Sequence, residues 1–473
     1  MSKIEVVDVL YIHPTKKLGS LVYSIAPTGA FLLMNLIRSE YNVKGINYGV
    51  EKSIRYHYDL EEELKKISYK VLLIDLHWYE HSFGALEIAA LSKKLYNEVP
   101  VIIGGFTSTI YSKEILTDFH VVDYILKGDS EVPFHLLIDY LVKGIGNVSS
   151  IPNLGYRDNG VVIDKEITYC CSNIDDYDYV SVDFMKHPEC CYYTTTGGIK
   201  EKKASSYWLC IARGCIFNCS YCCGSRINLR KLYGRNHMIC RSVQKVVSDM
   251  QRLVDAGVKV ICPTHDFEMF GEKYYHELFE KIRELKLDVG IYLECFQLPS
   301  KDFIDDFCNT FNQKLSIIVI SPLCGNDKLR KENGKVFDNI ELFEALTHMA
   351  KRRVILDLYY SLNLPGEMEE DFEVTCEQIK QVLDCYPSEL LTLYYQRVAL
   401  DPLAPMREKP FNVKSNMNTF MDYYNYCASG NENYTGYDDY GTQTLTYKIE
   451  KYDDIRQKLK REGREKNKNY ILV

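Results

Sequence analysis

Two series of short, β-branched apolar runs alternate with helix-like segments along this chain of 473 residues. The first series predicts strands at residues 6–12, 43–46, 71–76, 99–105 and 121–126. Apolar residues at helical spacing separate these runs, at residues 27–40, 59–67, 83–96, 112–117 and 131–143. Strands that alternate with helices favour a parallel sheet with right-handed crossovers. Residues 1–145 are therefore predicted to form a doubly wound, Rossmann-like domain.

The second series begins near residue 206. It predicts strands at residues 207–213, 259–264, 288–295, 315–321, 354–362 and 390–398. Six β/α units favour a partial (β/α)6 barrel of the TIM type over a second doubly wound sheet, so residues 206–405 are predicted to form this barrel. Residues 146–205 are predicted to be a linker with a small sheet. Residues 406–473, where the alternation stops, are predicted to be a C-terminal region that covers the barrel.

Charge and hydropathy limit the classes of partner. The formal net charge is −8, whereas a general nucleic-acid binder needs a basic face, so nucleic acid is not an expected partner. No apolar run approaches the roughly 18 residues of a membrane span, and the first residues lack a signal-peptide pattern. We expect a cytoplasmic protein with no membrane partner.

The cysteines carry the clearest chemical signal. Seventeen are present, none precedes Cys170, and the odd number argues against a disulfide framework. Cys215, Cys219 and Cys222 form a C-x3-C-x2-C pattern directly after a strand-like run. Three thiolates on one tight loop can hold three irons of a cubane and leave the fourth iron open to another ligand. A structural zinc ion would need a fourth ligand, which Cys210 or Cys223 could supply, so zinc is the alternative.

The segment from Arg213 to Cys222, RGCIFNCSYC, resembles the cluster loop of the radical S-adenosylmethionine (SAM) superfamily. The aromatic residue before the last cysteine, Tyr221, belongs to that signature. The resemblance implies a [4Fe-4S] cluster on the three cysteines, with SAM bound at the open iron. It also implies a 5′-deoxyadenosyl radical that abstracts hydrogen from the substrate. The cofactors supply this chemistry, and the protein supplies their position.

The resemblance further implies that SAM is bound at the C-terminal ends of the barrel strands, where barrel sites lie. Asp266 is the candidate for the amino group, Glu294 for the ribose and Arg330 for the carboxylate. Glu294 could instead be a satisfied buried acid, and Arg330 a surface helix residue. The SAM-binding candidates are Tyr221, Asp266, Glu294, Ser321, Arg330 and Gly366.

Two turns of the first domain resemble those of the cobalamin-binding domain that is fused to many radical SAM enzymes. They lie in residues 101–109 and 121–131, with Thr107 where histidine is usual and Asp129 where glutamate is usual. The implied cobalamin contacts are Gly104, Gly105, Thr107, Ser108, Gly128 and Glu131. A domain that binds no cobalamin remains the alternative.

The D-x-H-x-x-G loop, which lends an axial histidine to cobalt in other cobalamin proteins, is absent from the first domain. His13 lies in the corresponding loop with the wrong spacing and is interpreted as a polar loop residue. We therefore expect cobalamin to be bound without a histidine from this loop. The segment from His77 to His81 is expected to face the corrin.

The resemblance as a whole implies a cobalamin-dependent radical SAM methyltransferase that acts at an unactivated carbon. Its substrate would be a small molecule or a peptide, and its electrons would come from an external donor of the flavodoxin or ferredoxin type. The same architecture also supports cyclisation, ring contraction or oxidation without methyl transfer. The alternative of another class is a non-catalytic Fe–S or zinc module.

Overall fold

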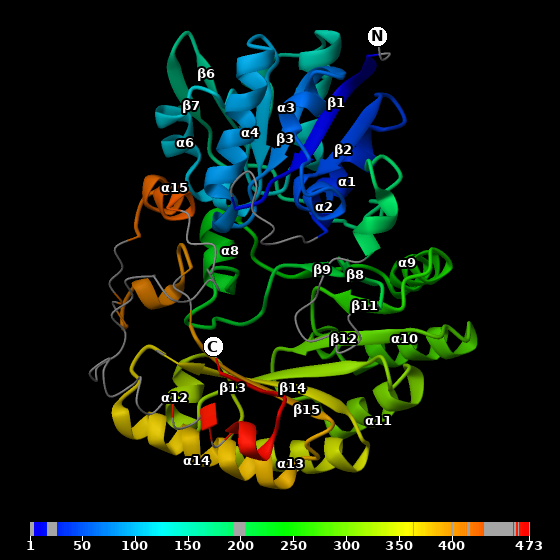
Figure 1. Cartoon of the computed structure of the whole chain (residues 1–473), viewed down its shortest axis with the longest axis vertical. Helices are drawn as coiled ribbons and strands as arrows, with labels where there is room; N and C mark the ends of the chain where they lie inside the picture. The colour runs from blue at the N-terminus through cyan, green and yellow to red at the C-terminus, as the bar shows by residue number, and fades with distance from the viewer. Residues whose placement is uncertain are drawn as a thin grey trace. The chain divides into compact units, whose positions relative to one another are not determined.

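The computed structural model describes residues 4–16, 26–192, 204–362, 364–398, 401–411, 413, 417–429, 457, 460–461 and 463–472. The described residues form two compact units (Figure 1). The first unit contains the residues up to 192 together with 230–235 and 417–429. The second contains the other described residues.

A seven-stranded sheet forms the centre of the first unit, in the order β2-β1-β3-β4-β5-β6-β7. Its strands are β1 (Glu5–His13), β2 (Val43–Asn47), β3 (Ile67–Asp75), β4 (Val101–Gly104), β5 (Tyr124–Leu126), β6 (Leu154–Asp158) and β7 (Val161–Asp164). The pairings among the first five are parallel. The order reverses between β1 and β3, and doubly wound sheets bind ligands beyond the carboxyl ends of the strands at such a reversal.

Helices connect the parallel strands of this unit close to the predicted positions. They are α1 (Thr28–Ile37), α2 (Tyr48–Ile54), α3 (Leu60–Leu64), α4 (Ser82–Leu95), α5 (Phe106–Ile110), α6 (Ser112–Asp118) and α7 (Glu131–Ile138). The segment predicted as a helix at 59–67 ends early because Ile67 already begins β3. Two short helices, α2 and α5, were not predicted, since neither is long enough to show a helical period.

The hairpin β6–β7 extends the first sheet and is not a separate small sheet. β6 pairs with β5, and β7 with β6, both antiparallel. Asn159 and Gly160 form the two-residue turn, with φ of 49° and 83°. An Asn-Gly pair in which both residues have positive φ is the preferred connection of a tight hairpin. The prediction of a small sheet within residues 146–205 is corrected accordingly.

The second unit is built on a seven-stranded sheet in the order β16-β15-β14-β13-β12-β11-β8. All of its pairings are parallel. Its strands are β8 (Ser206–Leu209), β11 (Val260–Pro263), β12 (Gly290–Cys295), β13 (Ile317–Leu323), β14 (Ile355–Leu362), β15 (Leu391–Arg397) and β16 (Tyr470–Leu472). The first six follow one another in chain order, as successive β/α units of a barrel do. The last strand, which was not predicted, adds to the edge beside β15.

Helices alternate with the strands of the second unit (Figure 1). They are α8 (Arg226–Tyr233), of which residues 230–233 belong to the first unit, α9 (Val243–Asp255), α10 (Glu272–Glu284), α11 (Lys301–Thr310), α12 (Asp327–Glu332), α13 (Asn339–Lys351) and α14 (Glu369–Cys385). α9 begins where Ser242 accepts a hydrogen bond from the Lys245 amide, and it is followed by Gly257 with φ of 92°. Ser242 is thus the N-cap of α9, and Gly257 allows the chain to leave the helix.

The described part of the C-terminal region divides between the two units. α15 (Phe420–Ala428) packs against α4 of the first unit, with the Tyr423 and Tyr79 rings 5.0 Å apart. β16 belongs to the second sheet. The prediction that residues 406–473 cover the barrel stays a prediction, and residues 414–416 and 430–456 lie outside the described residues. Within the described part, no helix is both long and apolar enough to cross a bilayer.

Candidate functional site

The three predicted cluster cysteines lie on one compact loop that follows β8 and β9 (Ala212–Arg213) and precedes α8. Cys215, Cys219 and Cys222 are partly exposed, and none of them is in a disulfide. The loop folds back on itself, because the Cys222 amide donates to the Cys219 carbonyl at 3.3 Å and the Arg226 amide to the Phe217 carbonyl at 2.8 Å. The loop thus presents three reduced thiols from eight consecutive residues.

The spacing of the thiols suits separate irons better than one zinc ion. Among the described residues, the three sulfur atoms do not form a group within 4.8 Å of one another. Zinc–sulfur bonds of about 2.3 Å would place tetrahedral ligands roughly 3.8 Å apart. Thiolates on different corners of a cubane lie farther from one another than ligands of a single ion. The donor set therefore fits a cluster.

The two cysteines that could have closed a zinc site are engaged elsewhere. The buried Cys210 thiol donates to the Ala212 carbonyl at 3.6 Å. The Cys223 thiol lies beside the Asp401 carboxyl group, and burial together with that neighbour raises its pKa well above the ordinary value. Burial also raises the pKa of Asp401 to about 6. A thiol beside a carboxylate resists conversion to the thiolate that binds metal.

The turn after α12 supports the cysteine loop. Gly334 has φ of 104°, and a Cβ there would lie 2.7 Å from the Cα of Cys219. The Ser220 hydroxyl donates a hydrogen bond to the side-chain oxygen of Asn333. The Gly334 carbonyl accepts a hydrogen bond of 3.0 Å from the Gln297 side chain, which follows β12. The loop is therefore positioned by contacts that are distant in sequence.

Lys335 brings a buried positive charge to this turn. Its ammonium donates to the Phe296 carbonyl at 2.6 Å and is attracted by Cys219, Asp266 and Glu294. Burial lowers the pKa of Lys335. Sequence reasoning missed this residue, because a lysine after a helix is usually exposed and nothing local marked it as buried.

The predicted SAM-binding residues lie along one edge of the second sheet. Asp266 follows β11, Glu294 lies in β12, Ser321 in β13, and Gly366 follows β14. Because these strands are parallel, their carboxyl ends share an edge. Tyr221 of the cysteine loop packs against the cluster of Leu323, Cys324, Leu329 and Leu364 near that edge.

Two acids at this edge differ in their surroundings. Asp266 is 4% exposed and accepts hydrogen bonds of 3.0 Å from the amides of Glu268 and Phe296, so it joins the ends of β11 and β12. Burial raises the pKa of Asp266 to about 6. The Glu294 side chain is solvent-accessible, although the protein around it raises its pKa. Glu294 is thus the acid more open to a ligand, and it is not the satisfied buried acid of the alternative interpretation.

Arg330 has an environment that sequence reasoning did not anticipate. It is completely buried, so it is not a surface helix residue. Its guanidinium donates to the carbonyls of Pro322 and Cys324, at 2.9 and 2.5 Å. It also reaches the side chains of Asp327, Asn339 and Gln378. With its donors directed at protein groups, Arg330 connects β13 to the helices around it, and it leaves Lys335 as the cation nearer the cysteine loop.

The predicted cobalamin residues of the β4 turn hold that turn together. A Cβ on Gly105, which has φ of 130°, would lie 2.6 Å from the His77 backbone nitrogen. The Thr107 hydroxyl donates to the His77 carbonyl at 2.8 Å, and the Ser108 hydroxyl to the Gly105 carbonyl at 3.1 Å. The turn therefore packs against the end of β3, and Gly104 is left partly exposed at the sheet edge.

The β5 turn is also explained by local packing. Gly128 has φ of 64°, its amide donates to the Thr109 hydroxyl at 3.0 Å, and a Cβ would lie 2.9 Å from the Tyr233 ring. Glu131 begins α7 and is buried. His77 and Trp78, which follow β3, are exposed at the carboxyl edge, Trp78 by 43%. An open edge lined by glycines and an indole ring fits a flat ligand.

His13 is not the polar loop residue that the sequence suggested. It is the last residue of β1 and is 1% exposed. Its Nδ1 lies 2.8 Å from Asp75 Oδ1, at the end of β3. The interpretation was wrong because the strand continues through His13, and the carboxylate that pairs with it is 62 residues away.

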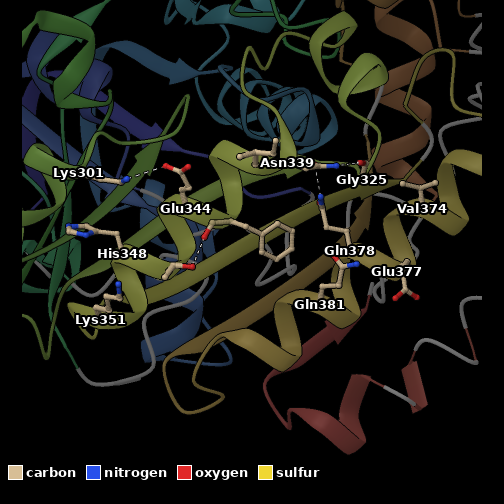
Figure 2. A pocket seen from close by; sticks show the side chains of 13 residues that line it. Lys301, Gly325, Asn339, Glu344, His348, Lys351, Val374, Glu377, Gln378 and Gln381 are labelled. Carbon is tan, nitrogen blue, oxygen red and sulfur yellow. Dashed lines mark hydrogen bonds and ion pairs between the residues drawn. The ribbon is translucent and has the colours of Figure 1, made fainter.

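A pocket of about 790 Å³ lies on the helical side of the second unit (Figure 2). Most of its lining comes from α13 and α14, and Asn339 within it donates to the Gly325 carbonyl. Lys301 and Glu344 form an ion pair of 3.1 Å across it. None of the predicted cluster, SAM or cobalamin residues lines this pocket.

The chain is similar to known proteins over most of its length, although no family model matches it. An uncharacterised methyltransferase of Pyrococcus horikoshii is 24% identical over 294 residues, which are 61% of this chain and 57% of that protein. The chain thus spans little more than half of that relative.

Solved structures match more of the chain. The radical SAM methyltransferase TsrM of Kitasatospora setae, with cobalamin and a [4Fe-4S] cluster bound, has a TM-score of 0.64 at 14% identity. That match covers 89% of this chain and 81% of TsrM. The cobalamin-dependent radical SAM enzyme OxsB, with aqua-cobalamin bound, has a TM-score of 0.60 at 11% identity and covers 94% of this chain and 59% of OxsB. The predicted α/β fold class is confirmed, and the chain has the fold of the cobalamin-dependent radical SAM enzymes.

Proposed function

We propose that this protein is a cobalamin-dependent radical SAM methyltransferase that acts at an unactivated carbon of a small molecule or peptide. The observation that carries the proposal is the loop of three accessible thiols whose two potential fourth ligands, Cys210 and Cys223, are engaged elsewhere. When bound, the cofactors supply a carbon radical and a methyl group. The fold match to TsrM and OxsB supports the same assignment.

The residues of the second unit divide the work of binding. Cys215, Cys219 and Cys222 hold three irons. Lys335 offsets the negative charge that their thiolates bring into a buried environment. Glu294, with Ser321 and Gly366 on the same sheet edge, faces SAM. Asp266 holds the ends of β11 and β12 together and so keeps that edge in place.

The first unit binds cobalamin at the carboxyl edge of its sheet. Gly104 and Gly105 in the β4 turn, and Gly128 in the β5 turn, lack side chains and so let the ligand approach the backbone. Trp78 provides an apolar surface beside them. TsrM has also been solved with its tryptophan substrate, which supports a small-molecule substrate for this chain as well. We assign electron supply to an external flavodoxin or ferredoxin.

The test of radical chemistry uses the full-length protein, reconstituted anaerobically with iron and sulfide. With SAM and a reductant, the wild type is expected to form 5′-deoxyadenosine. Cys219→Ala should abolish this product, and the matched variant Cys223→Ala should retain it. Equal activity of the wild type and Cys219→Ala, or loss in both variants with the fold intact, contradicts the three-cysteine assignment.

Methyl transfer is distinguished from other radical reactions by a second product. A methyltransferase forms S-adenosylhomocysteine as well as 5′-deoxyadenosine when its substrate is present. Cyclisation, ring contraction or oxidation gives 5′-deoxyadenosine or its equivalent without S-adenosylhomocysteine. The relevant assay therefore quantifies both nucleosides in the same turnover with candidate substrates.

A further inference from the structure

Three potential metal ligands converge at the carboxyl ends of β1 and β3. His13 ends β1, Asp75 ends β3, and His81 belongs to the short helical turn Tyr79–His81 that follows β3. One ligand atom from each lies within 4.8 Å of the other two. Both histidines are buried, at 1% and 0% exposure, and the Asp75 side chain is 12% exposed. The reversal of strand order between β1 and β3 brings the three together.

A hydrogen bond already brings two of the three ligands together. His13 Nδ1 donates to Asp75, at 2.8 Å from Oδ1 and 3.1 Å from Oδ2. Because the two ring nitrogens of a histidine point in different directions, only Nδ1 can share an ion with this carboxylate. A bound metal ion would take the place of the Nδ1 proton, since metal ligands are deprotonated.

The third ligand lies against the first. The His13 and His81 rings meet edge to face, with centroids 5.2 Å apart. Imidazole nitrogens and a carboxylate oxygen are ligand types that divalent transition metals accept.

We propose that His13, Asp75 and His81 bind a divalent transition-metal ion, with Zn²⁺ as the best match to two imidazoles and one carboxylate. Three protein ligands leave a fourth position open for water or another ligand. Tyr11 holds the carboxylate of Asp75 in position, since its hydroxyl donates to Asp75 Oδ1 at 2.6 Å. The three ligands belong to the first unit and the cysteine loop to the second, and the proposal does not depend on the proposed radical chemistry.

A second cluster in the same unit shows what a weaker arrangement looks like. Glu40, His135 and Asp139 also offer ligand atoms within 4.8 Å of one another. None of them is buried, and both carboxylates already pair with Lys143, at 2.9 and 3.3 Å. In the His13 cluster both histidines are instead buried, and the carboxylate pairs with a histidine of the cluster itself.

The test measures zinc bound to the full-length protein after equilibrium dialysis against Zn²⁺, without iron, sulfide or cobalamin. His13→Ala and Asp75→Asn are each expected to bind one zinc ion fewer per chain than the wild type. His276→Ala is the matched control, because His276 forms an exposed pair of 2.9 Å with Asp306 and no third ligand joins them among the described residues. Zinc content that is the same in the wild type and both cluster variants overturns the proposal.

Two further measurements cover misfolding and the other metal-binding groups of the chain. Tyr11→Phe keeps the aromatic core and all three ligands, and it should weaken zinc binding about tenfold through the loss of its hydrogen bond. The X-ray absorption spectra of zinc in the wild type and in His13→Ala should differ by a contribution from nitrogen and oxygen ligands. A difference that comes from sulfur ligands overturns the proposal. Nitrogen coupling to cob(II)alamin that disappears in His13→Ala would assign the imidazole to corrin cobalt and would also overturn it.

Discussion

Lys335 is the residue whose environment most needs an explanation in terms of the proposed cluster. A buried ammonium is costly unless negative charge lies near it, and Cys219, Asp266 and Glu294 supply that charge. Three thiolates around an iron cluster would add more. The same lysine therefore stabilises whichever state of the cluster carries the greater negative charge.

This reasoning predicts the effect of Lys335→Met on the cluster. Loss of the ammonium disfavours the reduced state, so the midpoint potential should fall by roughly 60 mV, a tenfold change in a one-electron equilibrium. A potentiometric titration followed by electron paramagnetic resonance measures it. The control is Lys301→Met, in an exposed ion pair with Glu344. Equal potentials in the wild type and Lys335→Met contradict the assigned role.

Asp266 predicts a pH dependence of stability. Its pKa is about 6 in the folded protein against an ordinary 3.8, so between these values the folded state binds more protons than the unfolded chain. Stability therefore falls as pH rises from about 4 to 6 and is constant above, a change of roughly 3 kcal/mol at most. Asp266→Asn should flatten this slope in denaturant unfolding of the apoprotein.

The control for this measurement is another aspartate at a helix N-terminus. Asp338 caps α13 by accepting from the Glu341 amide, as Asp266 accepts from Glu268. Asp338→Asn should leave the slope between pH 4 and 6 unchanged. A slope that is the same in Asp266→Asn and the wild type would show that other groups cause it.

Sequence reasoning found the residues of the site that are marked locally and missed those that are not. The spacing of Cys215, Cys219 and Cys222 is a local pattern, and the structure places all three on one loop. Lys335 gains its importance from contacts across the fold. Arg330 shows the converse case, because the resemblance implied a contact with the SAM carboxylate whereas its donors are directed at protein groups. The roles of Lys335 and Arg330 depend on their burial, which cannot be predicted from the residues next to them in sequence.

At the scale of elements, the turn after α12 predicts a specific sensitivity. Gly334→Ala would place a Cβ 2.7 Å from the Cys219 Cα, in addition to the strain of φ at 104°. We expect a loss of about 1–2 kcal/mol from the backbone alone and a further displacement of the cysteine loop. Iron content after reconstitution should therefore fall well below that of the wild type.

Gly257→Ala is the matched control for that turn. Gly257 has a similar φ of 92°, but nothing lies within 4 Å of the position of its Cβ. It should lose a similar backbone energy while retaining the iron content of the wild type. If both variants retain full iron, the contact between Gly334 and Cys219 does not position the loop.

α15 predicts the effect of a change far along the chain on the first unit. Tyr423 is fully buried against Tyr79 and Tyr111, and Cys427 donates to the Tyr79 carbonyl at 3.3 Å. Tyr423→Ala should destabilise this unit by about 3 kcal/mol and raise hydrogen exchange in α4. Met421→Ala, on the more exposed face of the same helix, should leave exchange unchanged. Unchanged exchange in Tyr423→Ala would contradict the packing of α15 on α4.

Element prediction succeeded where one segment carries its own signal. β1 and β14 lie within two residues of their predicted bounds, because continuous apolar runs mark strands that are buried on both faces. β16 could not be predicted, since its three residues form a strand only through pairing with β15. α5 was hidden in the same way, because a helix of five residues shows no period.

For the whole molecule, strand–helix alternation was sufficient to predict two α/β units, and the fold match to TsrM and OxsB confirms that class. Strand order required the structure, because alternation does not say on which side of β1 the next strand adds. The order β2-β1-β3 places His13 beside Asp75, and chain-order addition aligns the strand ends from β8 to β14 along one edge. The strand order of each sheet therefore determines which residues meet at its carboxyl edge.

Mössbauer spectroscopy of the ⁵⁷Fe-reconstituted full-length protein tests the central claim most directly. The account predicts a [4Fe-4S] cluster with three irons bound by Cys215, Cys219 and Cys222 and one distinct iron. The signal of that distinct iron should shift when SAM is added and should not shift with 5′-deoxyadenosine, which lacks the amino-acid group that can bind iron. A cluster whose four irons are equivalent and insensitive to SAM, or a protein that takes up no cluster, would contradict the account.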